Sequence, residues 1–180
     1  MSHIHTKPGQ HDQTISIYIV RLGGKEPRVM FHLHKKYQVY MQFGGHVELN
    51  ENPWQALIRE TREETGYDIN QLQVLQPKTA LTDLSGVVNH PIPISFNTHN
   101  VVDLDHYHID SAFAFVTDQE PRHPLGSDES SAIRLFTKKQ LEDLPPEQTY
   151  ENGRQTAQFI FDHCLKDWDR VPASLFAAAF

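Results

Sequence analysis

Three glutamates in one short segment have the spacing needed to act together on a cation. Glu60, Glu63 and Glu64 stand at positions i, i+3 and i+4, and on a helix this spacing places their carboxylates side by side. In a partly buried cleft, two like charges about 4 Å apart repel by about 4 kcal/mol at an effective dielectric constant of about 20. A compensating positive charge is therefore expected next to these carboxylates.

The residues alone leave three interpretations of this acidic face. The neighbouring Arg59 and Arg62 could supply the positive charge, or the glutamates could form a solvated face with ion pairs along the helix. A hard divalent cation would balance the charge better, because Mg²⁺ takes oxygen ligands and commonly bridges carboxylates to substrate phosphates. In that case an acidic surface would become a phosphate-binding site.

The segment from Asn52 to Gly66 is predicted to be the helix that carries these glutamates. Asn52 can cap the helix, Pro53 suits its first position, and Gln55 completes a capping-box pair with Asn52. Gly66 is well placed to end the helix in a left-handed conformation. The flank next to the glutamates is predicted to be buried, because it carries Trp54, Leu57, Ile58, Thr61 and Thr65.

The pattern around this helix resembles the signature of the Nudix hydrolases. That signature is Gly, five residues, Glu, seven residues, Arg-Glu, an apolar residue, any residue, Glu-Glu, any residue, Gly and an apolar residue. All its fixed positions are matched here, by Gly45, Glu51, Arg59, Glu60, Glu63, Glu64 and Gly66. Thr61 and Tyr67 stand at the two apolar positions, where a methyl group and an aromatic ring can still pack.

The resemblance implies a reaction and a cofactor. Nudix enzymes hydrolyse a diphosphate linked to another moiety, usually a nucleoside diphosphate derivative, and they need Mg²⁺ or Mn²⁺. By this resemblance Glu60, Glu63 and Glu64 are the metal ligands, together with a backbone carbonyl of Gly44 or Gly45. Glu51 and Arg59 resemble the pair that orients the helix and its loop, a role compatible with an ordinary salt bridge. The catalytic residues implied in this way are Glu63, Glu64, Arg59 and Glu51.

Other groups could contribute to such a site. The general base varies in this family, and Asp128 and Glu129 are candidates outside the signature, although they could equally be solvated loop charges. His106, His108 and Asp110 would share one face of a strand and could contact substrate or a further metal. The alternative for the two histidines is a hydrogen-bonded pair on that strand. Five aromatic residues could stack on a base or belong to the core: Tyr18, Phe31, Tyr37, Tyr40 and Phe43.

The order of predicted elements favours one mixed α/β domain. Strands are predicted over residues 14–21, 28–34, 37–43, 71–75, 92–99, 107–117 and 132–136, and helices over 52–66, 138–144 and 152–166. The Gly44-Gly45 pair is expected to break the third strand. Residues 1–13 are expected to form a polar N-terminal segment, 14–168 the Nudix hydrolase domain, and 169–180 a tail packed on it. The resemblance implies an α/β/α sandwich around a mixed sheet.

Composition excludes several classes of partner. The 180 residues include 16 Lys and Arg against 23 Asp and Glu, a net charge of −7, which disfavours nucleic-acid polymers and anionic membrane surfaces. Since the single cysteine allows no intrachain disulfide and no apolar segment is long enough to cross a membrane, a cytoplasmic protein is expected. The expected partner is a small diphosphate substrate, and the family resemblance also allows a homodimer.

The main alternative function is a Nudix-fold module that binds a nucleotide without cleaving it. Such modules usually lose glutamates of the signature, whereas this chain keeps all of them. The substrate stays open. Thr82–Ser85 occupy the positions beyond the signature where a proline marks enzymes acting on ADP-ribose, or a tyrosine those acting on dinucleoside polyphosphates.

Overall fold

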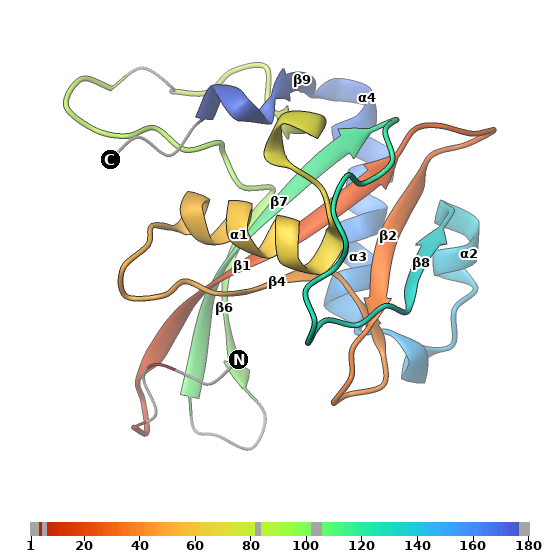
Figure 1. Cartoon of the computed structure of the whole chain (residues 1–180), viewed down its shortest axis with the longest axis horizontal. Helices are drawn as coiled ribbons and strands as arrows, with labels where there is room; N and C mark the ends of the chain where they lie inside the picture. Colours follow the sequence, from red (N-terminus) through yellow and green to blue (C-terminus); the bar gives the residue numbers. More distant parts are fainter. Residues whose placement is uncertain (1–3, 5–6, 82–83, 102–105, 177–180) are drawn as a thin grey trace.

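A mixed β-sheet with helices on both faces forms the centre of the molecule (Figure 1). The computed structural model describes residues 4, 7–81, 84–101 and 106–176. Parts of the expected terminal segments, residues 1–3, 5–6 and 177–180, lie outside this described portion. Helix α1 covers one face of the sheet and α3 the other, so the predicted α/β/α sandwich is confirmed.

The main path of the sheet has the strand order β3-β2-β1-β7-β5-β9, while β4 pairs with β1, β6 with β7 and β8 with β2. The strands are β1 His11–Arg21, β2 Arg28–Leu33, β3 Tyr40–Met41, β4 Phe43–His46, β5 Gln73–Gln76, β6 Ser95–Val101, β7 His106–Thr117, β8 Ile133–Phe136 and β9 Asp169–Pro172. Strands β1 and β7 run parallel along the whole of β1. They place residues that are distant in the sequence side by side at the centre of the sheet.

The helices are short apart from α1 and α3. They are α1 Pro53–Thr65, α2 Lys138–Glu142, α3 Glu151–Phe159 and α4 Leu165–Asp167, with 3₁₀ turns at Ile69–Gln71, Pro146–Gln148 and Ala173–Phe176. A π-helical turn, Ile160–Cys164, joins α3 to α4. The helix predicted over 152–166 is therefore helical throughout, but its hydrogen-bond pattern changes at Ile160.

Helix α1 begins and ends where the sequence predicts. The Asn52 side chain accepts hydrogen bonds from the backbone of Trp54 and Gln55, and Gln55 bonds back to the Asn52 amide at 2.8 Å. Gly66 ends the helix in the left-handed region, with φ of 72°. Its carbonyl also accepts the amides of Arg122 and His123, so the end of α1 is bonded to the loop that follows β7.

Alternating side chains of β1 build two separate core layers. Ile15, Ile17 and Ile19 face α1, where they pack in one cluster with Trp54 and Leu57. On the other face of the sheet, a second cluster combines residues of β1, β2, β7, α3 and the π-helical turn, among them Tyr18, Val20, Phe31, Ala114, Ala157 and Ile160. Both sides of the central strands are thereby buried, as a sandwich requires.

The Gly44-Gly45 pair does not break the sheet, so that prediction is wrong. Both glycines lie inside β4 and pair with β1, in the register Ile15 to Gly45 and Ser16 to Gly44. Gly44 has φ of 132°, and a Cβ atom there would lie 2.0 Å from the Ile15 carbonyl oxygen. The glycine thus allows a close approach of two backbones rather than ending a strand.

Several other boundaries also differ from the prediction, and β1 already begins at His11, within the segment expected to be a polar N-terminus. The strand predicted over 37–43 is reduced to the two residues of β3, followed directly by β4. The edge strand expected over 92–99 begins at Ser95, beyond Pro91 and Pro93, and extends to Val101. Within the segment expected as a tail, residues 169–172 form β9, which pairs antiparallel with β5. Sequence periodicity misses β9 because four residues are too few to show alternation.

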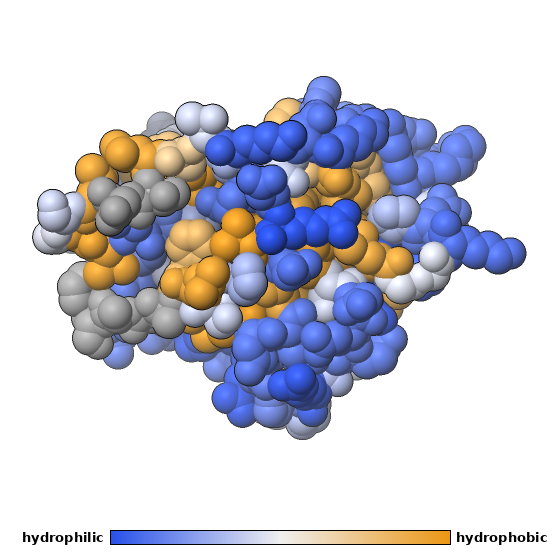
Figure 2. Space-filling view, turned by 90° about the horizontal axis from the view of Figure 1, so that it is seen from above, coloured by the Kyte–Doolittle hydropathy of each residue, from blue (hydrophilic) through white to orange (hydrophobic). Residues whose placement is uncertain are grey.

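Exposed apolar side chains gather at one end of the molecule. Leu81, Leu84 and Val87 lie in the loop between β5 and β6, with exposed fractions of 72%, 46% and 58%. Figure 2 shows hydrophobic atoms at that end and also along the middle of this face, with polar residues toward the opposite end. Among the described residues, no helix has the length and apolar character needed to cross a membrane.

Replacing Gly66 with alanine should destabilise the protein more than replacing Gly86. Both glycines have positive φ, 72° and 79°, but a Cβ would lie 2.3 Å from the His123 carbonyl oxygen at Gly66 and meets nothing within 4 Å at Gly86. Gly86→Ala should therefore cost about 1 kcal/mol of unfolding free energy. Gly66→Ala should cost about 2–4 kcal/mol. Urea unfolding of both variants measures the difference, and equal costs would contradict it.

Candidate active site

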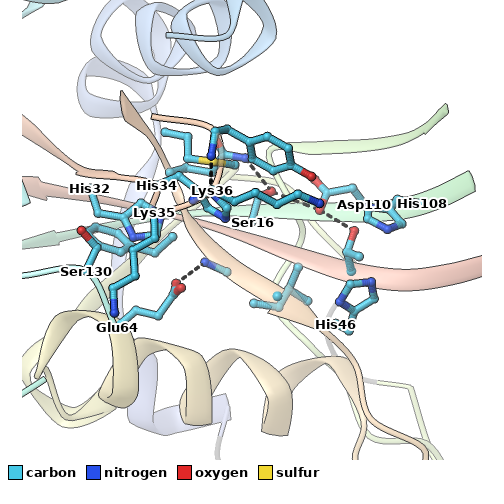
Figure 3. A pocket seen from close by; sticks show the side chains of 18 of the residues that line it. Ser16, His32, His34, Lys35, Lys36, His46, Glu64, His108, Asp110 and Ser130 are labelled. Carbon is cyan, nitrogen blue, oxygen red and sulfur yellow. Dashed lines mark hydrogen bonds between the residues drawn. The ribbon is translucent and has the colours of Figure 1, made fainter. Parts of the chain in front are cut away.

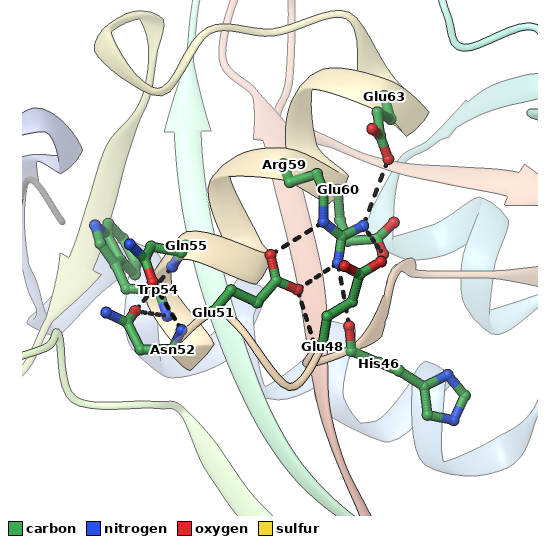
Figure 4. Close-up of polar contacts among 9 residues, drawn as sticks. All are labelled: His46, Glu48, Glu51, Asn52, Trp54, Gln55, Arg59, Glu60 and Glu63. Atoms are coloured by element: carbon green, nitrogen blue, oxygen red, sulfur yellow. Dashed lines mark hydrogen bonds and ion pairs between the residues drawn. The ribbon is translucent and has the colours of Figure 1, made fainter. Parts of the chain in front are cut away.

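Arg59 connects the helix α1 to the loop that precedes it (Figure 4). Its Nε and Nη2 atoms donate to the two carboxylate oxygens of Glu51, at 3.1 and 2.5 Å. Nη2 also donates to the His46 carbonyl at 3.2 Å, and Nη1 to Glu60 at 2.6 Å. This two-pronged geometry fixes the loop against the helix, which is the arrangement expected for Glu51 and Arg59.

The charges of this pair are mutually stabilised. Burial acts to raise the pKa of Glu51, but the hydrogen bond from Arg59, the bond from the Glu48 amide and the charge of Arg59 together hold this pKa below its ordinary value. The same bond to Glu51 raises the pKa of Arg59. Because Arg59 also contacts Glu60 and lies 3.5 Å from Glu63, a single guanidinium offsets part of the negative charge of three glutamates.

The remaining glutamate, Glu64, points to the sheet instead. It is 6% exposed and its Oε2 atom accepts the backbone amide of Gly44 at 2.6 Å. Burial raises its pKa well above the ordinary value, and the charges of Glu60 and Glu129 add to the effect. Glu60 is 1% exposed, and burial raises its pKa to about 7 although Arg59 acts against the shift. Burial and neighbouring carboxylates thus make the charged forms of Glu60 and Glu64 costly unless a positive charge lies beside them.

Glu129, one of the two base candidates in the loop before β8, meets the acidic end of α1. Its carboxyl contacts that of Glu64 and acts electrostatically on Glu60. Gly126 N donates to the Glu63 carbonyl at 2.8 Å, which fastens this loop to the helix. Asp128 lies in the same loop and its backbone oxygen accepts Lys35 Nζ at 2.6 Å. The fold thus brings Glu129 together with the glutamates of α1.

The carboxylate oxygens of Glu60, Glu63 and Glu64 are suitable ligands for a hard divalent cation. Carboxylate oxygens are the ligands that Mg²⁺ and Mn²⁺ prefer, and the buried, raised-pKa carboxyls of Glu60 and Glu64 are the groups a cation would stabilise. In the described portion of the chain, no three acidic, histidine or cysteine side chains already converge as a metal site. Arg59 holds Glu60 and Glu63, so binding would require these side chains to turn from the guanidinium toward the cation.

A pocket of about 670 Å³ opens beside Glu64 (Figure 3). Its walls come from α1, β1, β2, β3, β4, β6 and β7 and from the loops after β2 and before β8. The lining includes Ser16, His32, Gly44, His46, Glu64, His99, His108, Asp110 and Glu129. A volume of this order accommodates a small-molecule ligand. Gly45 lines the pocket as well, whereas Glu51, Arg59, Glu60 and Glu63 are not among its lining residues.

The structure separates the two candidate histidines of β7. His108 lines the pocket and its ring lies 4.9 Å from that of His46. His106 is 1% exposed, is not among the lining residues, and lies 3.3 Å from the Asp12 carboxylate. Asp110 lines the pocket from the same face as His108.

Several pocket residues were not singled out from the sequence, among them Lys35, Lys36 and His32. Lys35 and Lys36 lie in the loop after β2, and His32 lies at 5% exposure in β2. Two adjacent lysines at a predicted bend, Lys35 and Lys36, were the available sign of a binding residue. Lysines at a turn usually point into solvent, so this sign is weak. Of the five aromatic candidates, Tyr18, Phe31 and Phe43 are buried in the core, while Tyr37 lines the pocket at 46% exposure.

Comparison with known proteins gives the family. The model of the NUDIX domain matches residues 12–159, which include the signature helix, the Gly44 strand and the loop with Glu129. The chain therefore belongs to the Nudix hydrolase family, as a Nudix-type pyrophosphohydrolase. No curated protein matches the chain significantly. The resemblance seen in the sequence is thereby confirmed.

Solved structures of the family superpose over most of the chain. A NUDIX-family hydrolase from Clostridium perfringens is 29% identical, with a TM-score of 0.68, over 84% of this chain and 96% of that one. An Ap4A hydrolase from C. elegans is 16% identical (TM-score 0.56, 82% and 93% covered). A dihydroneopterin triphosphate pyrophosphohydrolase from E. coli is 17% identical (TM-score 0.59, 84% and 96% covered). The last two share the fold with this chain.

The buried His32 should make the protein less stable in acid. Burial lowers its pKa from 6.5 to about 4, and the neighbouring His34 adds to the shift. Above pH 6.5 the imidazole is neutral in both the folded and unfolded states, and the full stability is present. As the pH falls toward 4, only the unfolded state takes up the proton, which lowers the unfolding free energy by up to about 3 kcal/mol.

Denaturant titrations at pH 7 and pH 4.5 measure this loss. His32→Gln should reduce the difference between the two pH values, because glutamine does not titrate. His11→Gln, at an exposed position of β1, is the matched control and should leave the difference unchanged. An unaltered difference in His32→Gln would contradict the assignment.

Proposed function

We propose that this protein hydrolyses the diphosphate linkage of a nucleoside-diphosphate-type small molecule with the help of a divalent cation. The observation that carries the proposal is the excess of carboxylates at the end of α1, beside a pocket of ligand size. An acidic site repels a diphosphate unless a cation reverses the local charge. The same residues would therefore bind the cation and, through it, the substrate.

Glu60, Glu63 and Glu64 would hold the cation, Mg²⁺ or Mn²⁺, and the backbone carbonyl of Gly45 is the further ligand we propose. When bound, the cation neutralises diphosphate charge and stabilises the charge that develops on the transferring phosphoryl group. The support in this chain is the burial of Glu60 and Glu64 and the reach of Glu63, whose side chain is 49% exposed. All three carboxylates lie in the C-terminal half of helix α1.

The other residues of the site position groups and move a proton. Arg59 and Glu51 keep the loop of residues 46–51 against α1, which holds β4 and its amide beside Glu64. A carboxylate must accept the proton of the attacking water. Glu129 is the stronger of the two loop candidates, because it contacts Glu64, while Asp128 lines the pocket a residue earlier.

The pocket rim suits a phosphorylated ligand. Lys35 and Lys36 line the pocket, and their ammonium groups can offset substrate charge that the cation does not reach. Two structural neighbours are an Ap4A hydrolase and a dihydroneopterin triphosphate pyrophosphohydrolase, names consistent with a phosphorylated substrate that carries a planar ring system.

A homodimer is the assembly we propose. Its support is the strand β6, which among the described residues pairs only with β7 and exposes Phe96 at 68%. An apolar residue on an open edge strand favours pairing with a second copy of the chain. Sedimentation analysis of the purified protein reports the assembly directly.

Hydrolysis should depend on the cation and on Glu64. With Mg²⁺, the wild type should release phosphate-containing products from a panel of nucleoside diphosphate derivatives, and chelation of the metal should abolish this activity. Glu64→Gln should lower kcat on the order of 100-fold or more, because the amide removes a charge at the reacting centre. The matched control is Glu48→Gln, which changes an exposed glutamate in the loop that precedes α1. This variant should retain activity. A wild type that cleaves no compound of the panel would refute the proposal.

A further inference from the structure

Asp110 is a buried carboxylate with one oxygen fixed and the other directed at the pocket. The residue is 5% exposed and lines the pocket. Its Oδ1 atom accepts the hydroxyl groups of Thr14 at 2.9 Å and Ser16 at 3.1 Å. Ser16 is held in turn by Gln42, whose Nε2 donates to its hydroxyl at 3.3 Å. Within the described part of the chain, Oδ2 receives no hydrogen bond.

This arrangement defines what a ligand must offer. Burial raises the pKa of Asp110, while the Thr14 and Ser16 hydroxyls act in the opposite direction. Oδ2 is open to the pocket rather than sealed from solvent, so a donor on a ligand can take the place of water there. A ligand group with an N–H donor would satisfy Oδ2, whereas a group with only acceptors would be repelled by it.

Asp110 lies two strands away from β4, whose Gly45 carbonyl we propose as a cation ligand. In the sheet, Thr14 of β1 is paired with His46 of β4 on one side and with Asp110 of β7 on the other. Two strand spacings therefore separate Asp110 from β4, about 10 Å. Figure 3 shows Asp110 and His108 on the side of the pocket away from Glu64. A sugar placed next to the diphosphate would bring an attached base to Asp110.

The same pocket offers surfaces for a flat ring. The Tyr37 ring is stacked on His34, with centroids 4.7 Å apart and an interplanar angle of 23°. Met41 and Val101 add apolar contacts to the lining. Stacking on an aromatic side chain strengthens the binding of every base to a similar degree. The discrimination between bases therefore has to come from a polar group.

We propose that Asp110 determines base specificity by accepting a hydrogen bond from an exocyclic amino group of the substrate base at Oδ2. This inference rests on the proposed diphosphate hydrolysis and specifies its substrate class: nucleotides whose base carries an amino group. Thr14 and Ser16 are positioning residues, because they hold the carboxylate so that only Oδ2 is available.

The test compares nucleotides that differ in one amino group. The two pairs are guanosine against inosine triphosphate and adenosine against purine-riboside triphosphate, with both kcat/KM and binding of each nucleotide measured. In at least one pair, the wild type should favour the amino-bearing member by about 10- to 100-fold, the worth of a hydrogen bond to a charged group. The difference should appear in KM, with kcat changed less than about threefold.

Asp110→Asn supplies the matched change. Its Oδ1 can keep the Thr14 and Ser16 bonds while an NH₂ group replaces Oδ2, so the preference should fall to near one or reverse. Asp118→Asn, at an exposed aspartate just beyond the other end of β7, should keep the wild-type preference. Since the wild-type ratios need no variant, a folding defect in Asp110→Asn leaves the test intact.

The outcomes separate this inference from the proposed function. Equal kcat/KM and binding within both pairs, or an unchanged preference in Asp110→Asn, would overturn the role of Asp110 while hydrolysis stands. Binding of none of the four nucleotides, with cleavage of another diphosphate, would overturn the substrate class alone. Selective binding of amino-bearing nucleotides without any hydrolysis would support the inference on Asp110 and remove the proposed reaction.

Discussion

The backbone of β4 lies against that of β1 more closely than any side chain at position 44 would permit. A Cβ on Gly44 would be 2.0 Å from the Ile15 carbonyl oxygen, so only glycine allows this contact. The approach presents the Gly44 amide to Glu64 at 2.6 Å and joins the acidic helix to the sheet. The pocket, bounded by β1, β4 and Glu64, exists because these two backbones meet.

Charge is distributed unevenly around this junction. One guanidinium, Arg59, contacts Glu51, Glu60 and Glu63, while the carboxyls of Glu64 and Glu129 lie together and repel each other. Burial and mutual repulsion then raise the pKa values of Glu60 and Glu64. Such perturbed carboxyls are typical of functional sites, and they explain why a divalent cation is the natural complement of this helix.

Prediction from the sequence succeeded where the signal is local. The boundaries of α1 follow from Asn52, Gln55 and Gly66, whose capping interactions involve residues within a few positions of one another. It failed at Gly44, because a glycine pair usually marks a turn and only the partner strand shows that a close approach is needed. It also missed β9, whose four residues form a strand by pairing with β5, a contact about a hundred residues away in the chain.

The sequence by itself determined the chemistry: the spacing of Glu60, Glu63 and Glu64, the family signature and the helix that presents them are all local patterns. The tertiary structure decided which distant groups join them. It brought Glu129 to Glu64, placed Lys35 and Asp110 on the same pocket, and left His106 away from it. These placements depend on the parallel pairing of β1 with β7 and on loop geometry. Both arise from non-local packing that residue spacing does not encode.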